Sequence, residues 1–178
     1  MVVEEIPYLL IGHLTEKGVI IDDIKAQEEL KKRGYGEEMG EKLLLKDYEA
    51  IFLLFSGKLR VLKDGKEISI NELVNMSKDA NIWTRFLIYR DLRSRGYVVS
   101  EGFGFGVDFR VYDRGEYGAK PAKYVVFGLN EGTKTSIKEL CEIVSQIERM
   151  GKEAVLAVIE RRGEVIYYKI QSWFPYKD

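Results

Sequence analysis

The feature that most constrains the fold is an almost unbroken apolar run at positions 123–129, with the sequence KYVVFGL. Such a run is typical of a β-strand that is buried on both faces of a sheet. Helical spacing follows at 136–150 and stops at Gly151, and two strand-like segments follow at 154–160 and 164–170. This succession predicts a sheet of mixed strand direction with helices packed against it.

The segment before this run predicts one helix and two strands. The helical pattern covers residues 82–95, and the strand patterns cover 97–100 and 107–112. Three glycines, at positions 102, 104 and 106, separate the two strands. A phosphate-binding loop is excluded here because the glycine-rich turn leads into a strand, whereas phosphate-binding loops lead into a helix.

The first 80 residues show shorter alternations of strand and helix patterns. The predicted strands are 9–14, 18–22, 59–62 and 67–70, and the predicted helices are 24–33, 45–55 and 70–80. Asn71 is the expected N-cap of the third helix. We therefore expect an α/β protein of the α+β type, with a small mixed N-terminal domain at 1–78 and a C-terminal domain at 79–178.

Composition narrows the class of protein but not its function. The chain has 178 residues, of which 46% are hydrophobic and 32% charged, so a folded protein is expected. Its net charge of -1 neither indicates nor excludes nucleic-acid binding. Cys141 is the single cysteine, which suits a reducing, cytoplasmic compartment. Residues 1–12 are too short and acidic for a signal peptide, and no run approaches the roughly 20 apolar residues of a membrane span.

The most specific motif covers residues 89–115, YRDLRSRGYVVSEGFGFGVDFRVYDRG. It combines Y-x-D-L-R-x-R-G-Y-x-V with G-F-x-x-G-x-D-F-x-x-Y-x-x-G. This run resembles the C-terminal domain of archaeal tRNA-splicing (tRNA-intron) endonucleases. The similarity extends more loosely to residue 168, and the layout of residues 8–80 is similar to the family's N-terminal domain. The resemblance implies a nuclease-like C-terminal domain that acts on precursor tRNA.

The resemblance also implies a metal-independent reaction that needs no cofactor. In the family a Tyr is the general base on the ribose 2′-hydroxyl, a His is the general acid on the leaving oxygen, and a Lys stabilises the charged phosphate. Tyr112 falls on the Tyr position and Lys152 on the Lys position, whereas Pro121 occupies the His position. Proline cannot donate a proton, and the sole histidine, His13, lies in the first predicted domain.

A second departure lies on the helix before the Lys position. Catalytic members usually carry an Arg and then a His-Ser pair there, but residues 144–149 read VSQIER. The pattern resembles the structural subunit of the heterotetrameric enzymes, which pairs with a homologous catalytic subunit. We therefore expect Tyr112 and Lys152 to be vestigial or weak, and the chain alone to be weak or inactive. The alternative is that neither residue belongs to a site, so that Tyr112 is simply a strand aromatic and Lys152 a solvated cation at a helix end.

The C-terminal region is expected to contact a partner. In the family an acidic loop docks into the opposite subunit, whereas the matching turn here, at 160–164, reads ERRGE and has mixed charge. The strand at 165–170 and the tail Trp173-Phe174-Pro175-Tyr176 are apolar and aromatic, as expected of an edge that a partner covers. The alternative is that the tail folds back on its own core.

Two other functions remain open at this level. One is a catalytic subunit with another proton donor, such as Lys120 or Tyr117. The other is a non-catalytic RNA- or DNA-binding module, because a fold does not determine a function. No metal is expected, because Asp108 is not followed by an E-x-K motif on the next strand, the arrangement that metal-dependent restriction-type nucleases need.

Overall fold

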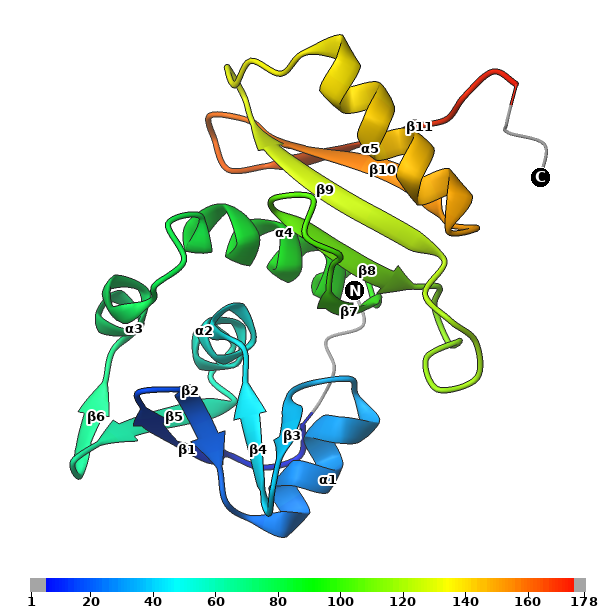
Figure 1. The fold of residues 1–178 in the computed structure, drawn as a ribbon. Helices are drawn as coiled ribbons and strands as arrows, with labels where there is room; N and C mark the ends of the chain where they lie inside the picture. The colour runs from blue at the N-terminus through cyan, green and yellow to red at the C-terminus, as the bar shows by residue number, and fades with distance from the viewer. Residues whose placement is uncertain (1–5, 175–178) are drawn as a thin grey trace. The chain divides into compact units, whose positions relative to one another are not determined.

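The computed structural model describes residues 6–174 of the chain (Figure 1). The chain divides into two compact units between Arg90 and Asp91, and this division falls within helix α4 (Ile82–Ser94). Each unit has its own β-sheet. The α+β class and the two-part organisation expected from the sequence are confirmed.

In the described part of the first unit, six strands form one sheet in the order β3-β4-β2-β1-β5-β6. Neighbouring strands are antiparallel except β1 and β5, which are parallel. The elements are β1 (Leu10–Thr15), β2 (Gly18–Ile21), α1 (Ile24–Lys32), β3 (Glu37–Met39), β4 (Lys42–Leu45), α2 (Asp47–Phe55), β5 (Leu59–Lys63), β6 (Lys66–Ile68) and α3 (Ile70–Met76).

Two local predictions for this unit were wrong. The N-cap of α3 is Ser69 and not Asn71, because Ser69 accepts from the backbone N–H of Glu72 while the Glu72 carboxylate accepts from the N–H of Ser69. The hairpin of β3 and β4 was not predicted. Leu45, predicted as the first residue of a helix at 45–55, is the last residue of β4, and α2 begins at Asp47. Strands of three and four residues are too short to show a clear alternation.

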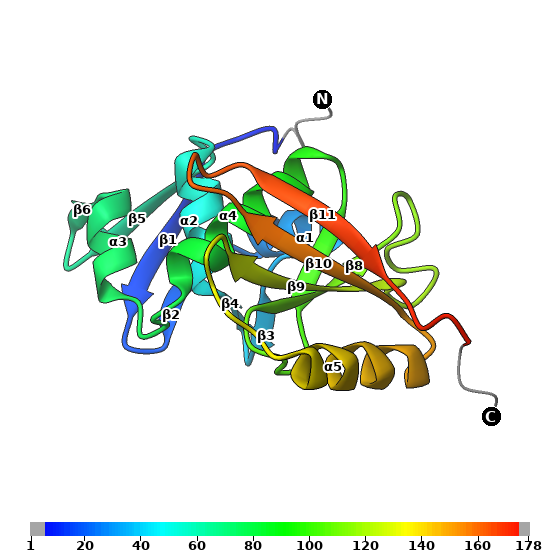
Figure 2. The ribbon, with the colours of Figure 1, turned by 90° about the horizontal axis from the view of Figure 1, so that it is seen from above.

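In the described part of the second unit, five strands form one sheet in the order β11-β10-β9-β8-β7. Figure 2 labels β11, β10, β9 and β8 of this sheet. Strands β9 and β10 are parallel, and the other neighbours are antiparallel. A parallel pair needs a crossover connection, which α5 supplies here. The elements after α4 are β7 (Val98–Glu101), β8 (Asp108–Tyr112), β9 (Tyr124–Asn130), α5 (Ile137–Arg149), β10 (Glu153–Ile159) and β11 (Val165–Ile170).

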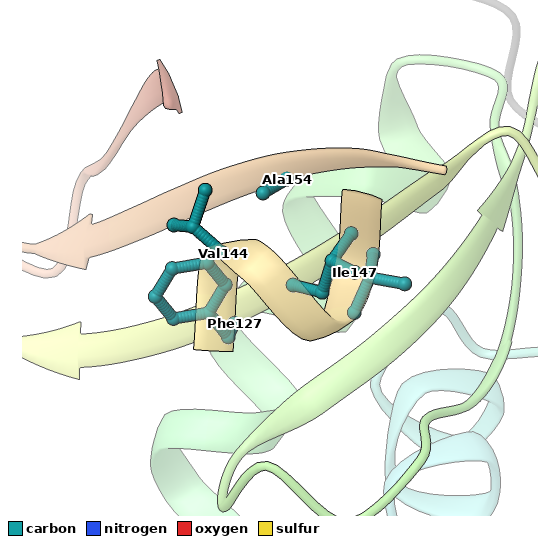
Figure 3. Close-up of a cluster of buried hydrophobic side chains, with 5 residues drawn as sticks. Phe127, Val144, Ile147 and Ala154 are labelled. Atoms are coloured by element: carbon teal, nitrogen blue, oxygen red, sulfur yellow. The ribbon is translucent and has the colours of Figure 1, made fainter. Parts of the chain in front are cut away.

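Helix α5 covers one face of this second sheet. Its buried side chains Val144 and Ile147 pack on Val125 and Phe127 of β9 and on Ala154 of β10 (Figure 3). The strand predicted from the apolar run at 123–129 is therefore confirmed as a central strand. Because strand side chains alternate, the intervening residues of β9 and β10 point to the opposite face.

Candidate functional site

The second sheet brings the three positions implied by the resemblance to one of its ends. Tyr112 is the last residue of β8, Pro121 lies three residues before β9, and Lys152 comes directly before β10. Because β8 is antiparallel to β9 and β9 is parallel to β10, the end of β8 meets the starts of β9 and β10. The strand order thus brings Tyr112, Pro121 and Lys152 to the same end of the sheet, although Lys152 is more distant in sequence.

Lys152 is hydrogen-bonded to the segment that contains Pro121. Its Nζ donates to the carbonyl oxygen of Ala122 over 2.6 Å. The backbone N–H of Lys123 donates to the carbonyl of Val111 at 3.0 Å, so the segment is also attached to β8. Pro121 itself is exposed. The position where a general acid is expected is therefore held in place, but the residue there has no proton to give.

Tyr112 is half-buried, and its ring packs against the edge of a second tyrosine. The ring centroids of Tyr112 and Tyr117 are 5.0 Å apart, with an angle of 88° between the ring planes. The ammonium group of Lys120 lies 2.6 Å from a carboxylate oxygen of Glu116. Tyr117 and Lys120 are the two alternative proton donors expected from the sequence. Tyr117 contacts Tyr112, the residue expected to act as the base, whereas Lys120 forms an ion pair with Glu116.

Lys123 is a basic residue at this end of the sheet that the sequence interpretation did not single out. Its Nζ lies 3.3 Å from a carboxylate oxygen of Asp113, the residue after Tyr112. Hydrogen bonds to Tyr124 and Asp113 raise the pKa of Lys123, and the backbone N–H of Arg114, with Lys123, lowers the pKa of Asp113. Lys123 therefore remains a cation at neutral pH. The only signal in the sequence was a lysine directly before the apolar strand.

Asp108 has a structural role in the glycine-rich turn. The side chain is buried, and it accepts hydrogen bonds from the backbone N–H groups of Phe103 at 2.7 Å and Gly104 at 3.3 Å. A Cβ atom on Gly102 would lie only 2.1 Å from Asp108 Oδ2. The G-F-x-x-G-x-D-F motif is thus a turn that is built around a buried carboxylate.

The sole histidine, His13, and the acidic residues are not grouped as metal ligands in the part of the chain that the structure describes. His13 lies on β1 in the other unit, where its Nε2 is 3.8 Å from a carboxylate oxygen of Asp22. Among residues 6–174, no group of three or more His, Cys, Asp or Glu side chains is arranged to hold a metal ion. Within the same range, no helix is long and apolar enough to cross a membrane.

The C-terminal strand β11 forms one edge of the sheet and carries exposed apolar side chains. Ile166 and Tyr168 are exposed on this strand. Trp173 and Phe174 are 88% and 84% exposed, so this part of the tail does not fold back on the core. Pro175 and Tyr176 lie outside the described residues. In the turn before β11, burial and the neighbouring Glu164 raise the pKa of Glu160.

Comparison with known proteins covers both units. The model of the tRNA intron endonuclease N-terminal domain matches residues 10–74, and that of the tRNA intron endonuclease catalytic C-terminal domain matches residues 82–167. The chain is 36% identical to a tRNA-splicing endonuclease of Pyrococcus furiosus, over 78% of this chain and 81% of the relative.

Similar proteins come from other archaea. A tRNA-splicing endonuclease of Thermococcus onnurineus is 36% identical over 83% of this chain and 86% of the relative. A tRNA-splicing endonuclease of Methanothermobacter thermautotrophicus is 31% identical over 78% of this chain and 82% of the relative. Since the similarity covers most of both lengths and the matched models account for both units, the chain belongs to the tRNA-splicing endonuclease family.

Proposed function

We propose that this chain is the structural subunit of a heterotetrameric tRNA-splicing endonuclease. The enzyme would excise introns from precursor tRNA at bulge–helix–bulge sites and leave 2′,3′-cyclic phosphate and 5′-hydroxyl ends. The observation that carries the proposal is the exposed Pro121 at the position of the general acid. The archaeal relatives named above are tRNA-splicing endonucleases, which supports precursor tRNA as the substrate.

The chemistry of RNA cleavage explains why proline in place of histidine at position 121 should lower the cleavage rate strongly. Attack by the ribose 2′-hydroxyl requires a base, and departure of the 5′-oxygen requires a proton. Tyr112 and Lys152 would serve as base and phosphate-stabilising cation, but Pro121 leaves the departing oxygen without a donor. Positioned acid–base groups contribute about 10²–10⁴-fold in rate. The chain alone is therefore a weak nuclease or an inactive one, with no requirement for metal.

The partner in this proposal is a homologous catalytic subunit. Support comes from the edge strand β11, which pairs with one strand only in the described sheet and exposes the apolar side chains Ile166 and Tyr168. Such an edge is a ready template for pairing with another chain. The one cysteine, Cys141, is free, which is compatible with action in the cytoplasm.

Cleavage assays in EDTA test the proposal. The chain alone should leave a precursor tRNA with a bulge–helix–bulge intact, whereas the mixture with the catalytic subunit should cleave it. Tyr112→Phe in this chain should not change the rate of the mixture. Full cleavage by the chain alone would overturn the structural role, and loss of cleavage in EDTA would overturn metal independence. Sedimentation of the mixture should show a heterotetramer, and separate monomers would contradict it.

A second candidate is a catalytic subunit in which Tyr117 is the proton donor. The edge-on contact between the Tyr117 and Tyr112 rings favours it over Lys120, which is paired with Glu116. Under this alternative the chain alone cleaves, and Tyr117→Phe abolishes the activity.

A further inference from the structure

A small cavity lies on the face of the second sheet opposite α5. Its volume is about 200 Å³, and it lies entirely within the second unit. Three tyrosines line it, Tyr97, Tyr124 and Tyr167, together with Arg95 and four aliphatic side chains. The walls are therefore aromatic and aliphatic, and Arg95 is an exposed member of the lining.

Each of the three tyrosines has a basic side chain over its ring. The guanidinium carbon of Arg95 is 5.6 Å from the ring centroid of Tyr167, and that of Arg114 is 5.1 Å from the centroid of Tyr97. The ammonium of Lys123 is 5.2 Å from the centroid of Tyr124. These distances are within the range of cation–π contacts. Arg95 thus lines the cavity itself, and Arg114 and Lys123 lie over the rings of two further lining tyrosines.

Two carboxylates share this environment. Asp91 lies 2.8 Å from Arg95 Nε and accepts a hydrogen bond of 2.7 Å from the Tyr167 hydroxyl. The Tyr167 hydroxyl is thus engaged with Asp91, and burial and this bond raise its pKa. Asp113 pairs with Lys123 at 3.3 Å. Three cations against two carboxylates leave a net positive charge.

The size and chemistry of the cavity select the class of ligand. Sites for drug-sized ligands have volumes of about 300–1,000 Å³, so this smaller space suits one flat ring system. Unpaired RNA bases stack on aromatic side chains, while nearby cations contact the phosphates. Val111 and Tyr124 of the lining lie at the same end of the sheet as Tyr112. Because strand side chains alternate, the cavity and the Tyr112 side chain are on opposite faces of the sheet at that end.

We propose that the cavity receives one unpaired base of the precursor tRNA, while Arg95, Arg114 and Lys123 contact the adjacent phosphates. The inference rests on the proposed function and adds a base-binding subsite to it. This subsite belongs to a single chain. It would therefore let a subunit without a general acid still hold a nucleotide of the precursor tRNA.

Filling the cavity tests the base-binding half of the inference. The probe is a five-nucleotide single-stranded RNA with one 2-aminopurine, whose fluorescence should change saturably on titration with the full chain. Val155→Phe places a ring in the cavity and should weaken binding at least tenfold. The matched control is Val158→Phe on the opposite face of the same strand, which should change affinity less than twofold. Equal affinities of the unchanged chain and a folded Val155→Phe variant would overturn the inference.

Neutralising the cations tests the phosphate-binding half without altering the interior. For single-stranded nucleic acid, the slope of log K against log salt is about -0.7 per neutralised phosphate. Arg114→Gln and Lys123→Gln should each make the slope shallower by about 0.7, whereas Lys138→Gln on α5 should not. An unchanged slope in both variants would count against the phosphate contacts.

Repeating the titrations with precursor tRNA separates the two proposals. If precursor tRNA binds the unchanged chain and Val155→Phe equally well, the cavity inference fails and the proposed function stands. If the unchanged chain binds precursor tRNA neither alone nor with the catalytic subunit, both fail. Weaker binding of precursor tRNA by Val155→Phe but not by Val158→Phe supports both.

Discussion

The ammonium group of Lys152 donates a hydrogen bond of 2.6 Å to the carbonyl oxygen of Ala122. This bond joins the start of β10 to the segment that carries Pro121, across 30 positions of sequence. A cation that would stabilise phosphate in a catalytic chain is thus a structural link here. Under the proposed function, Pro121, next to Ala122, occupies the position where a catalytic chain would carry its acid.

Removal of this link should destabilise the second unit. A hydrogen bond to a charged group contributes about 1.5–3 kcal/mol, and Lys152 is half-buried, so Lys152→Met should lower the free energy of unfolding by about 1.5 kcal/mol. Urea denaturation measures the loss. Lys138→Met, on the exposed side of α5, should cost less than about 0.5 kcal/mol. Equal stability of the two variants would show that the Ala122 contact contributes nothing.

The glycine-rich turn should tolerate no side chain at Gly102. A Cβ there would lie 2.1 Å from Asp108 Oδ2 and 2.7 Å from the Asp108 backbone carbon, so Gly102→Ala must displace the buried carboxylate. We expect a loss of about 2–3 kcal/mol in the free energy of unfolding, as for other overpacked sites. At Gly104 no atom lies within 4 Å of an added Cβ and only the φ of +92° opposes alanine. Gly104→Ala should therefore cost about 1 kcal/mol, and the reverse order would contradict this account of the turn.

The turn between β10 and β11 should make stability depend on pH. Burial and repulsion from Glu164 raise the pKa of Glu160, so the folded state binds the proton more tightly than the unfolded state. The ionised carboxylate therefore destabilises the fold above the raised pKa, and this effect disappears as the pH falls through it. Glu160→Gln should raise Tm at pH 7.5 and leave it nearly unchanged at pH 4. Thermal unfolding at both values checks this, and an equal gain at pH 4 would contradict it.

Restoration of an acid at position 121 should increase cleavage by the chain alone. Pro121 is exposed, so Pro121→His should cost at most about 1 kcal/mol of stability, through the greater freedom of the unfolded chain. If Tyr112 and Lys152 remain usable, the rate should rise by about 10²-fold. Because the protonated imidazole is the donor, the gain should decline as the pH rises through about 6.5. Pro121→His with Tyr112→Phe should lose the gain, and a gain that persists in this double variant would mean that Tyr112 is not the base.

Most of the fold was predictable because long patterns of apolar residues determine it. Clear periods of apolar residues are present in the run at 123–129, in helix α5 and in the paired strands β10 and β11. The β3–β4 hairpin was missed because its strands have three and four residues. The N-cap prediction of Asn71 was wrong because cap propensity alone does not predict the reciprocal contact between Ser69 and Glu72. The domain boundary at residues 78 and 79 stays a prediction.

By itself, the sequence determined the family, the fold class and the absence of a titratable group at position 121. These properties are carried by residue identities at fixed spacing along one segment. Only the tertiary structure placed Lys152 on Ala122 and Tyr167 on Asp91, residues that are 30 and 76 positions apart. The sheet register sets such contacts, and no local pattern encodes it. The cavity and its three cation–ring pairs depend on the same register, which is why they were found only in the fold.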